Sequence, residues 1–295
     1  MHSLRHYIMN SVSKVNCKWF QTSCSYSSQS LILVNEENGV RHIVMNDQKT
    51  RNALSVSMMM QLMDAINKDR DNPQLRCITL RSSHAQVFSS GHNLKQMALD
   101  KVGQSELQHI FTTCSKLMLS ILKHPVPIIA IISGVAAAAG CQLVASCDIA
   151  LATDSSRFST PGARHGIFCS TPAVALYRKI PEGVVRSMTI TGIPITAQYA
   201  YTVGLVTKVI SSDKDLENEI KIITNGILEN SRSVLALGKQ FLYQQLNMSI
   251  EEAYKVGGDT MVQNLCLQDG VEGMNAFIEK RHPQWSHSEE IYPLK

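Results

Sequence analysis

The apolar run from Val126 to Cys147, VPIIAIISGVAAAAGCQLVASC, constrains the fold of this chain more than any other segment. About 20 apolar residues suffice to cross a bilayer as a helix, so length alone would allow a membrane segment. However, the first half is β-branched, the second half is rich in alanine, and Ser133-Gly134 divides the two. This division predicts a buried strand, a turn and a small-residue helix, and we expect no membrane span.

A similar succession of strand, tight turn and helix start is predicted earlier in the chain, and we call each such succession a corner. Leu75 to Leu80 (LRCITL) has the composition of a buried strand, and VFSSGHNLK at residues 87–95 combines a glycine turn with a helix start capped by Asn93. A helix N-terminus exposes unpaired N–H groups and the positive end of the helix dipole. Two such corners facing one point would supply two donors to one oxygen atom, which is an oxyanion hole. Spacing alone does not distinguish them from the turns of any α/β protein.

The remaining pattern alternates strands with helices, which is typical of the α/β class. Residues 31–34 and 41–45 form an expected strand pair with Asn38-Gly39 as its turn. A helix begins at about Ser55, and its helical spacing places methionines in the core rather than on a binding surface. Further expected elements are a helix at 104–123, strands near 147–152 and 205–210, and charged helices from Asp213 onward.

Charge divides the chain into three parts, although 28 Lys and Arg against 24 Asp and Glu give only +4. Residues 1–30 contain three basic residues, no acid and eight serines, a composition that favours a mitochondrial transit peptide over an untargeted tail. Residues 31–212 carry 17 basic against 11 acidic residues, or +6, and residues 213–295 carry 8 against 13, or −5. We therefore expect a leader, a core and a helical C-terminal region, with no basic arm for nucleic acid.

The eight cysteines are scattered along the chain. None forms a C-x-x-C pair or a Cys/His cluster at zinc spacing. This distribution favours a reduced compartment and a protein without a structural metal.

The corner sequences carry more information than their spacing. The segments concerned are NAL (52–54), FSSGHNLK (88–95), SGVAAAAGCQL (133–143), CDI (147–149), FSTP (158–161), Thr191-Gly192 and EGMNAFIEKR (272–281). In this order they resemble the enoyl-CoA hydratase/isomerase (crotonase) superfamily over about residues 31–285.

The resemblance implies a spiral of ββα repeats followed by C-terminal helices that build a trimer or a dimer of trimers. It implies an acyl-CoA ligand, no other cofactor, and a role in fatty-acid metabolism in the mitochondrial matrix. By position, the backbone amides of Ser90 and Ala139 would form the oxyanion hole. The CoA-contacting positions would be Lys49, Arg51, Asn52, Ala53, Leu54, Ser89, Gly91, Asn93, Leu94, Ala136, Gly140, Phe277 and Lys280, of which Phe277 and Lys280 would reach a neighbouring subunit's CoA.

The sequence departs from the superfamily at both positions of the catalytic glutamates, where it has Gln142 and Gly162. Glutamine has no basic lone pair near neutral pH and glycine has no side chain. Because each general acid or base contributes about 10²- to 10⁴-fold in rate, we expect no ordinary hydratase activity. Alanines at 136–139 stand where the superfamily often has glycine, and a methyl group resists positive φ.

Other side chains could replace the missing acids. His92 and His165 are candidate bases, Cys141 and Cys169 candidate nucleophiles, and Asp154 a candidate acid. Packing histidines, buried cysteines and a turn aspartate are the simpler interpretations. The expected function is acyl-CoA binding without hydration. The alternatives are a thioester hydrolase or isomerase that uses a different base, and a non-catalytic assembly or regulatory subunit.

Overall fold

The structure is a computed structural model that describes residues 30–98 and 102–293. Almost all of the expected leader, residues 1–30, therefore lies outside the described residues, and the transit peptide stays a prediction. From Leu31 onward, the described residues form one compact unit. Among the described residues, no helix combines the length and the apolar composition needed to cross a bilayer.

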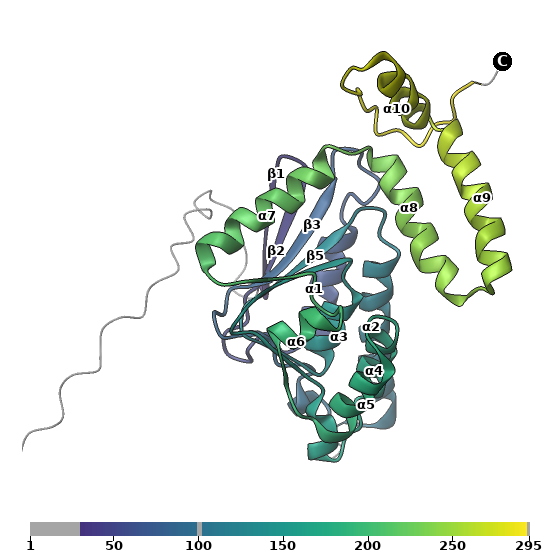
Figure 1. Cartoon of the computed structure of the whole chain (residues 1–295). Coiled ribbons are helices and arrows are strands. Elements are labelled where there is room, and N and C mark those ends of the chain that lie inside the picture. Colours follow the sequence, from purple (N-terminus) through teal and green to yellow (C-terminus); the bar gives the residue numbers. More distant parts are fainter. Residues whose placement is uncertain (1–29, 99–101, 294–295) are drawn as a thin grey trace, which may run out of the picture. The chain divides into compact units, whose positions relative to one another are not determined.

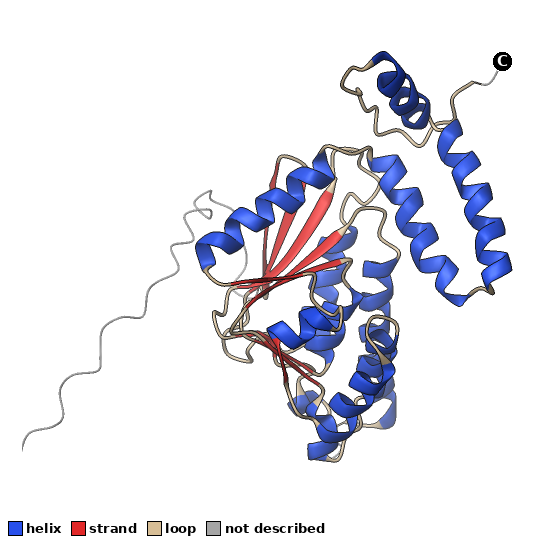
Figure 2. Ribbon diagram, viewed as in Figure 1, coloured by secondary structure: helices blue, strands red, loops and turns tan. Residues whose placement is uncertain are grey.

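Two β-sheets organise the chain (Figure 2). The larger sheet has the order β1-β2-β3-β5-β7-β10, and the smaller one has the order β4-β6-β8-β9. The first set comprises β1 (Ile32–Glu37), β2 (Val40–Met45), β3 (Cys77–Ser82), β5 (Ile128–Ile132), β7 (Ile149–Thr153) and β10 (Lys208–Ile210). The second comprises β4 (Val87–Ser89), β6 (Val135–Ala137), β8 (Arg157–Ser159) and β9 (Ile195–Thr196). From β2 to β10 the larger sheet is parallel, as are β4, β6 and β8 in the smaller one.

A strand–strand–helix unit repeats along the core. β3 and β4 lead to α2 (Gln104–Leu122), β5 and β6 lead to α3 (Ala139–Ser146), and β7 and β8 lead to α4 (Ser170–Tyr177). In each unit the first strand joins the larger sheet and the second joins the smaller one. This arrangement confirms the ββα repeat expected for the core.

Local sequence signals explain where the first elements begin. Asn38 and Gly39 both have positive φ, 51° and 79°, as the tight turn between β1 and β2 requires. The Ser55 hydroxyl accepts the Met58 N–H at 3.1 Å and caps α1 (Val56–Asn67). The sequence predicted the turn and a helix start at about Ser55, whereas the capping hydrogen bond is seen only in the structure.

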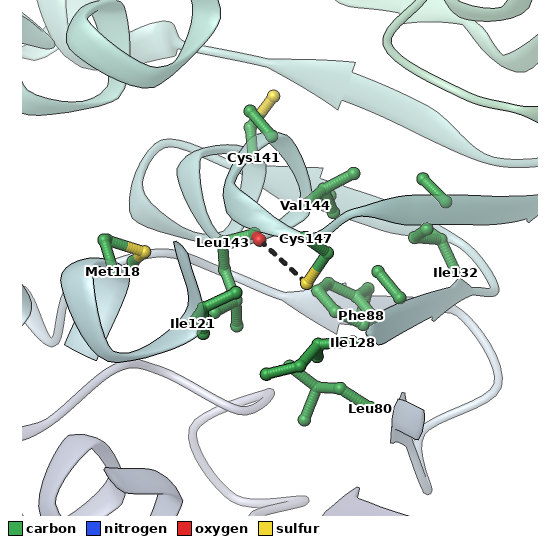
Figure 3. Close-up of a cluster of buried hydrophobic side chains, with 14 of the residues drawn as sticks. Leu80, Phe88, Met118, Ile121, Ile128, Ile132, Cys141, Leu143, Val144 and Cys147 are labelled. Atoms are coloured by element: carbon green, nitrogen blue, oxygen red, sulfur yellow. Dashed lines mark hydrogen bonds between the residues drawn. The ribbon is translucent and has the colours of Figure 1, made fainter. Parts of the chain in front are cut away.

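The central strands of the larger sheet, β3, β5 and β7, are buried on both faces. On β5, Ile128, Ala130 and Ile132 belong to the apolar cluster that includes α1, α2 and α3, whereas Ile129 and Ile131 pack with α7 (Asp213–Leu228). Figure 1 shows α7 along this second face. Figure 3 shows Leu143 of α3 and Cys147, the residue after α3, on the side of Phe88 and Ile128, with the Cys147 thiol donating to the Leu143 carbonyl. The change in composition at Asp213 therefore marks a helix that still covers the sheet.

The other helices follow β8 or lie near the C-terminus. They are α5 (Glu182–Thr191), α6 (Ala197–Thr202), α8 (Arg232–Gln244), α9 (Ile250–Cys266) and α10 (Gln268–Glu279), with short 3₁₀ turns η1 (Leu94–Gln96), η2 (Pro161–His165) and η3 (Gln245–Asn247). Helices α9 and α10 pack against α8 and against each other (Figure 1). We expected helices after Asp213 but not β4, β6, β8 and β9, whose two or three residues are too short to show a period.

Helix α8 is attached to the core by a buried ion pair. Lys239 Nζ lies 2.7 Å from Asp148 Oδ2, and the two side chains are 7% and 16% exposed. The ammonium also donates to the carbonyl oxygens of Ile121 and Val126, and the Tyr243 hydroxyl donates to Asp148 Oδ1. All three Lys239 protons thus have acceptors, which compensates for removing the charge from water.

Replacing Lys239 by Met should lower the free energy of unfolding by about 3–5 kcal/mol, because Asp148 would stay buried without its cation. Urea unfolding measures this. The matched control is Arg186→Met, which removes the exposed Arg186–Glu182 pair and should cost less than about 1 kcal/mol. Equal effects of the two substitutions would contradict the anchoring role of Lys239.

Candidate functional site

Three parallel strands of the smaller sheet end side by side, and the candidate site lies at this edge. Ser89 on β4 pairs with Ala136 on β6, and Ala137 on β6 pairs with Ser159 on β8. Because the carboxyl ends of neighbouring parallel strands meet at one edge, the turns that follow them are adjacent. These turns begin at Ser90, Ala138 and Thr160.

The turn after β4 is held by the loop at residues 49–54. The Ser89 hydroxyl donates to the Asn52 carbonyl at 2.8 Å, and Asn52 Nδ2 donates to the Phe88 carbonyl at 3.2 Å. The Leu54 N–H donates to the Gly91 carbonyl at 2.7 Å. Asn52 is fully buried and has a φ of 52°, so it serves as a structural brace between this loop and the turn.

The expected oxyanion donor at Ser90 does not fit the structure. The Ser90 N–H already donates to the Arg51 carbonyl at 3.1 Å, and its hydroxyl donates to the Thr50 carbonyl at 3.0 Å. The Gly91 N–H contacts the Ser89 hydroxyl oxygen at 3.3 Å. Across the described residues, the next amide, that of His92, has no acceptor. The sequence pattern predicted the free amide at Ser90, the residue before Gly91. The hydrogen bonds instead leave an amide free at His92, the residue after Gly91.

The turn after β6 supplies a second free amide. Ala138 donates its N–H to the Ser159 carbonyl at 2.8 Å, and Ala139 is the first residue of α3. No acceptor for the Ala139 N–H occurs in the described part of the chain, as is usual for the first residues of a helix. The second donor predicted from the sequence is therefore available, and the dipole of α3 reinforces it.

Two glycines bring these turns into contact. A Cβ on Gly91 would lie 2.9 Å from the Ala138 Cβ and 3.4 Å from the Ala139 nitrogen. A Cβ on Gly140 would lie 2.7 Å from both the Cβ and the carbonyl oxygen of Ser89. Any side chain at either position would therefore push the turns apart.

The Ala138 backbone adopts the strained conformation expected in the alanine-rich turn. Its φ is 48° and its ψ is −117°, a region that alanine rarely occupies. Such a residue costs on the order of 1–3 kcal/mol and persists only where its surroundings enforce it. Here the contact with Gly91 on one side and the Ser159 hydrogen bond on the other enforce it.

No carboxylate stands at either position where the superfamily has a catalytic glutamate. The Gln142 side chain is buried, and its Oε1 lies 3.9 Å from the Cys114 thiol of α2. A Cβ at Gly162 would lie only 2.1 Å from the Ile167 carbonyl oxygen and 2.7 Å from the Cys169 sulfur. Glycine is therefore required by the path of the chain through η2, a constraint that the sequence alone did not reveal.

His92 joins the site, but its environment does not suit a base. Burial lowers the pKa of His92, and Nδ1 lies 3.4 Å from the Leu54 carbonyl oxygen. The imidazole is perpendicular to the Phe111 ring of α2, with centroids 5.3 Å apart. Nε2 is covered and has no partner among the described residues.

The other candidate catalytic groups stand apart from this chemistry. His165 is exposed on η2, and Asp154 is an exposed turn residue after β7. Burial raises the pKa of Cys141 to about 12 and also raises that of Cys169, so neither thiol forms a thiolate readily.

The residues expected to contact CoA fall into three groups. The first group is buried in the bracing loop, in the two turns and at the strand ends beside them, and comprises Asn52, Ala53, Leu54, Ser89, Gly91, Ala136 and Gly140. Asn93 lies next to this group and caps η1. Lys49, Arg51 and Leu94 are exposed beside the first turn and are available to a ligand. Phe277 is exposed on α10, and Lys280 is the exposed residue that follows this helix. Because α10 packs against α8 and α9, a single chain does not bring the two residues to the site (Figure 1).

The enoyl-CoA hydratase/isomerase family model matches residues 35–288. The chain belongs to this family. It is 48% identical over 250 residues to the human enoyl-CoA hydratase domain-containing protein 3, mitochondrial, covering 85% of this chain and 82% of the relative. The mouse protein of the same name is 47% identical over 263 residues, covering 89% and 87% of the two chains.

Solved structures agree with this assignment. A crystal structure of human enoyl-CoA hydratase domain-containing protein 3 has a TM-score of 0.84 and 44% identity, with 87% of this chain and 100% of that chain covered. An enoyl-CoA hydratase from Mycobacterium smegmatis has a TM-score of 0.83 and 37% identity, with 87% and 99% covered. These findings confirm the resemblance and the crotonase-like α/β fold. The names of the relatives agree with the predicted location of this chain, which is mitochondrial.

Gly140→Ala should separate the two turns and lower the free energy of unfolding by about 1–3 kcal/mol, because the new methyl group meets the Ser89 backbone. Denaturant unfolding tests this. Gly226→Ala is the control, since Gly226 is an exposed position of α7 with open space around its Cβ. That control should be neutral or stabilising by up to about 1 kcal/mol. A Gly140→Ala protein as stable as the wild type would contradict the contact.

Gly162→Glu should also destabilise the protein, by about 1–3 kcal/mol or more, because the Ile167 carbonyl occupies the space that its Cβ needs. Its exposed neighbour Ala163 provides the control, and Ala163→Glu should change stability by less than about 0.5 kcal/mol. Thermal unfolding of both variants decides the matter. If Gly162→Glu melts with the wild type, glycine is not required at this turn.

Proposed function

We propose that this protein binds acyl-CoA thioesters in the mitochondrial matrix, as part of fatty-acid metabolism, and does not catalyse ordinary enoyl-CoA hydration. The observation that carries the proposal is the contact between two turns with free amides, His92 and Ala139. Two backbone N–H groups at one place suit a thioester oxygen, because this oxygen accepts two hydrogen bonds. His92 replaces Ser90 as the proposed first donor.

The absence of hydration follows from the chemistry of the two replaced positions. The Gln142 amide can orient a water molecule but cannot remove its proton near neutral pH. Gly162 has no side chain, and its surroundings leave no room for one. A hydrolase or isomerase would need another base, and the lowered pKa of buried His92 and the exposed position of His165 do not favour one.

We also propose that the chain forms a homo-oligomer through its C-terminal helices. Tyr254 on α9 is 78% exposed, and Phe277 and Ile278 on α10 are 83% and 70% exposed. Exposed apolar side chains of this size on neighbouring helices are typical of a surface that is covered by another subunit. Sedimentation equilibrium would distinguish a trimer from a hexamer.

The thioester oxygen can be tested from the side of the ligand. Butyryl-CoA should bind at micromolar concentration in a calorimetric titration. Its thioether analogue S-butyl-CoA, which lacks only the carbonyl oxygen, should bind about tenfold more weakly, since hydrogen bonds to that oxygen are lost. Equal binding of the two would contradict the oxyanion hole, and no binding of either would remove the acyl-CoA assignment. Crotonyl-CoA should show no hydration in the same preparation.

A further inference from the structure

The segment that follows α10, residues 281–292, returns along this helix and is bonded to it at both ends. Near the end of α10, the Gln284 N–H donates to the Glu272 carboxylate at 2.7 Å. At the start of α10, the Gln268 N–H donates to the Glu290 carbonyl oxygen at 3.0 Å. We call residues 281–292 the C-terminal strap.

The middle of the strap is held by a buried carboxylate. Asp269, on the first turn of α10, is 2% exposed. It accepts the main-chain N–H groups of Ser286 and His287 at 2.7 and 2.9 Å. It also accepts the hydroxyl of Ser231, the N-cap of α8, at 2.6 Å. Although burial acts against ionisation, the hydrogen bonds from Ser231 and Ser286 hold the pKa of Asp269 below its usual range. One carboxylate thus joins the strap to α10 and to α8.

The His287 imidazole, on the strap, faces hydrogen-bond donors at both of its nitrogens. Arg76 Nη1, from the residue before β3, lies 2.7 Å from Nε2, and the main-chain nitrogen of Arg232 lies 3.3 Å from Nδ1. The two arginine side chains are buried and hold their own acceptors, the carbonyl oxygens of Leu228 and Leu75. A guanidinium and a main-chain N–H only donate, so neither could accept an additional N–H from the ring.

The charges around His287 act in the same direction. Burial lowers its pKa, the positive charges of Arg76 and Arg232 lower it further, and the carboxylate of Asp269 opposes them. Glu289, also on the strap, is 70% exposed and pairs with Arg232 Nη1 at 3.3 Å. An imidazolium here would therefore lie against a guanidinium, and its new N–H would meet a donor. Protonation of His287 and attachment of the strap exclude each other.

We propose that the C-terminal strap is an acid-sensitive fastening of α10, which is closed while His287 is neutral and opens when His287 takes up a proton. In the open strap the imidazole is in water, where the pKa of a histidine is about 6.5. Because the closed form has the lower pKa, the open form binds more protons, and acid below this pH favours it. These contacts lie outside the candidate acyl-CoA site, so the strap does not depend on that proposed activity. Its opening would loosen α10, which carries Phe277 and Ile278 of the proposed oligomer surface.

Trp285 provides a local measurement of the strap. It is half-buried, its Nε1 donates to the Glu229 carbonyl at 2.7 Å, and a Cβ on Gly273 of α10 would lie 3.2 Å from its ring. The other tryptophan of the chain, Trp19, lies outside the described residues. In the full chain with Trp19→Phe, acrylamide quenching of Trp285 should therefore increase when the pH falls from about 7.5 to about 5.5.

Two histidine variants in this background test the cause. His287→Gln keeps an acceptor for Arg76 but does not titrate, so quenching should stay at its low value at both pH values. His282→Gln, at an exposed histidine of the same strap, is the matched control and should keep the increase. The proposal is wrong if quenching does not change without these substitutions, or if His287→Gln keeps the increase.

Hydrogen exchange of the wild-type chain decides the case in which His287→Gln does not fold. After correction for the intrinsic pH dependence, protection of the Ser286 and His287 amides should fall about tenfold between about pH 7.5 and 5.5, since the open strap gains a proton. Strand β5 should stay protected. Full protection of the strap at the lower pH would overturn the proposal. A parallel loss in β5 would also overturn it, because acid would then unfold the chain as a whole.

Discussion

The contact between the turns after β4 and β6 is the constraint on which the candidate site depends. Gly91 and Gly140 allow the two backbones to touch, and this contact sets the distance between the free amides of His92 and Ala139. Ala138 lies between them, and its neighbours enforce its strained backbone conformation. A site built from backbone amides is therefore as rigid as the strand pairing β4-β6-β8 that supports it.

The sequence predicted the elements whose signals are local. The Asn38-Gly39 turn, the helix start near Ser55 and the division at Ser133-Gly134 each follow from the chemistry of a few residues, and all three are observed. The short strands β6 and β8 were missed because three residues show no periodicity. Each of these strands follows a strand of the larger sheet, so its pairing depends on how that sheet is arranged. A local sequence pattern does not predict such long-range pairing.

The same limit applies to the individual residues of the site. Motif order placed the glycines, Ala139 and Gln142 correctly at adjacent turns, because these positions are fixed relative to the glycines. It did not reveal which amide after β4 is free, since this depends on the Arg51 carbonyl, which lies far away in sequence and takes the Ser90 N–H. Nor did it reveal that the Ile167 carbonyl fills the space beside Gly162. Both facts come from the path of the chain, which residue types alone do not specify.

The proposed loss of hydration is compatible with an intact architecture, because holding a carbonyl oxygen and transferring a proton depend on different groups of such a site. Backbone amides hold a carbonyl oxygen whatever the side chains at 142 and 162 are, so proton transfer can be lost while the two turns stay intact. A carboxylate cannot be introduced at position 162 with the same ease, because the Cβ of any new side chain there would meet the Ile167 carbonyl.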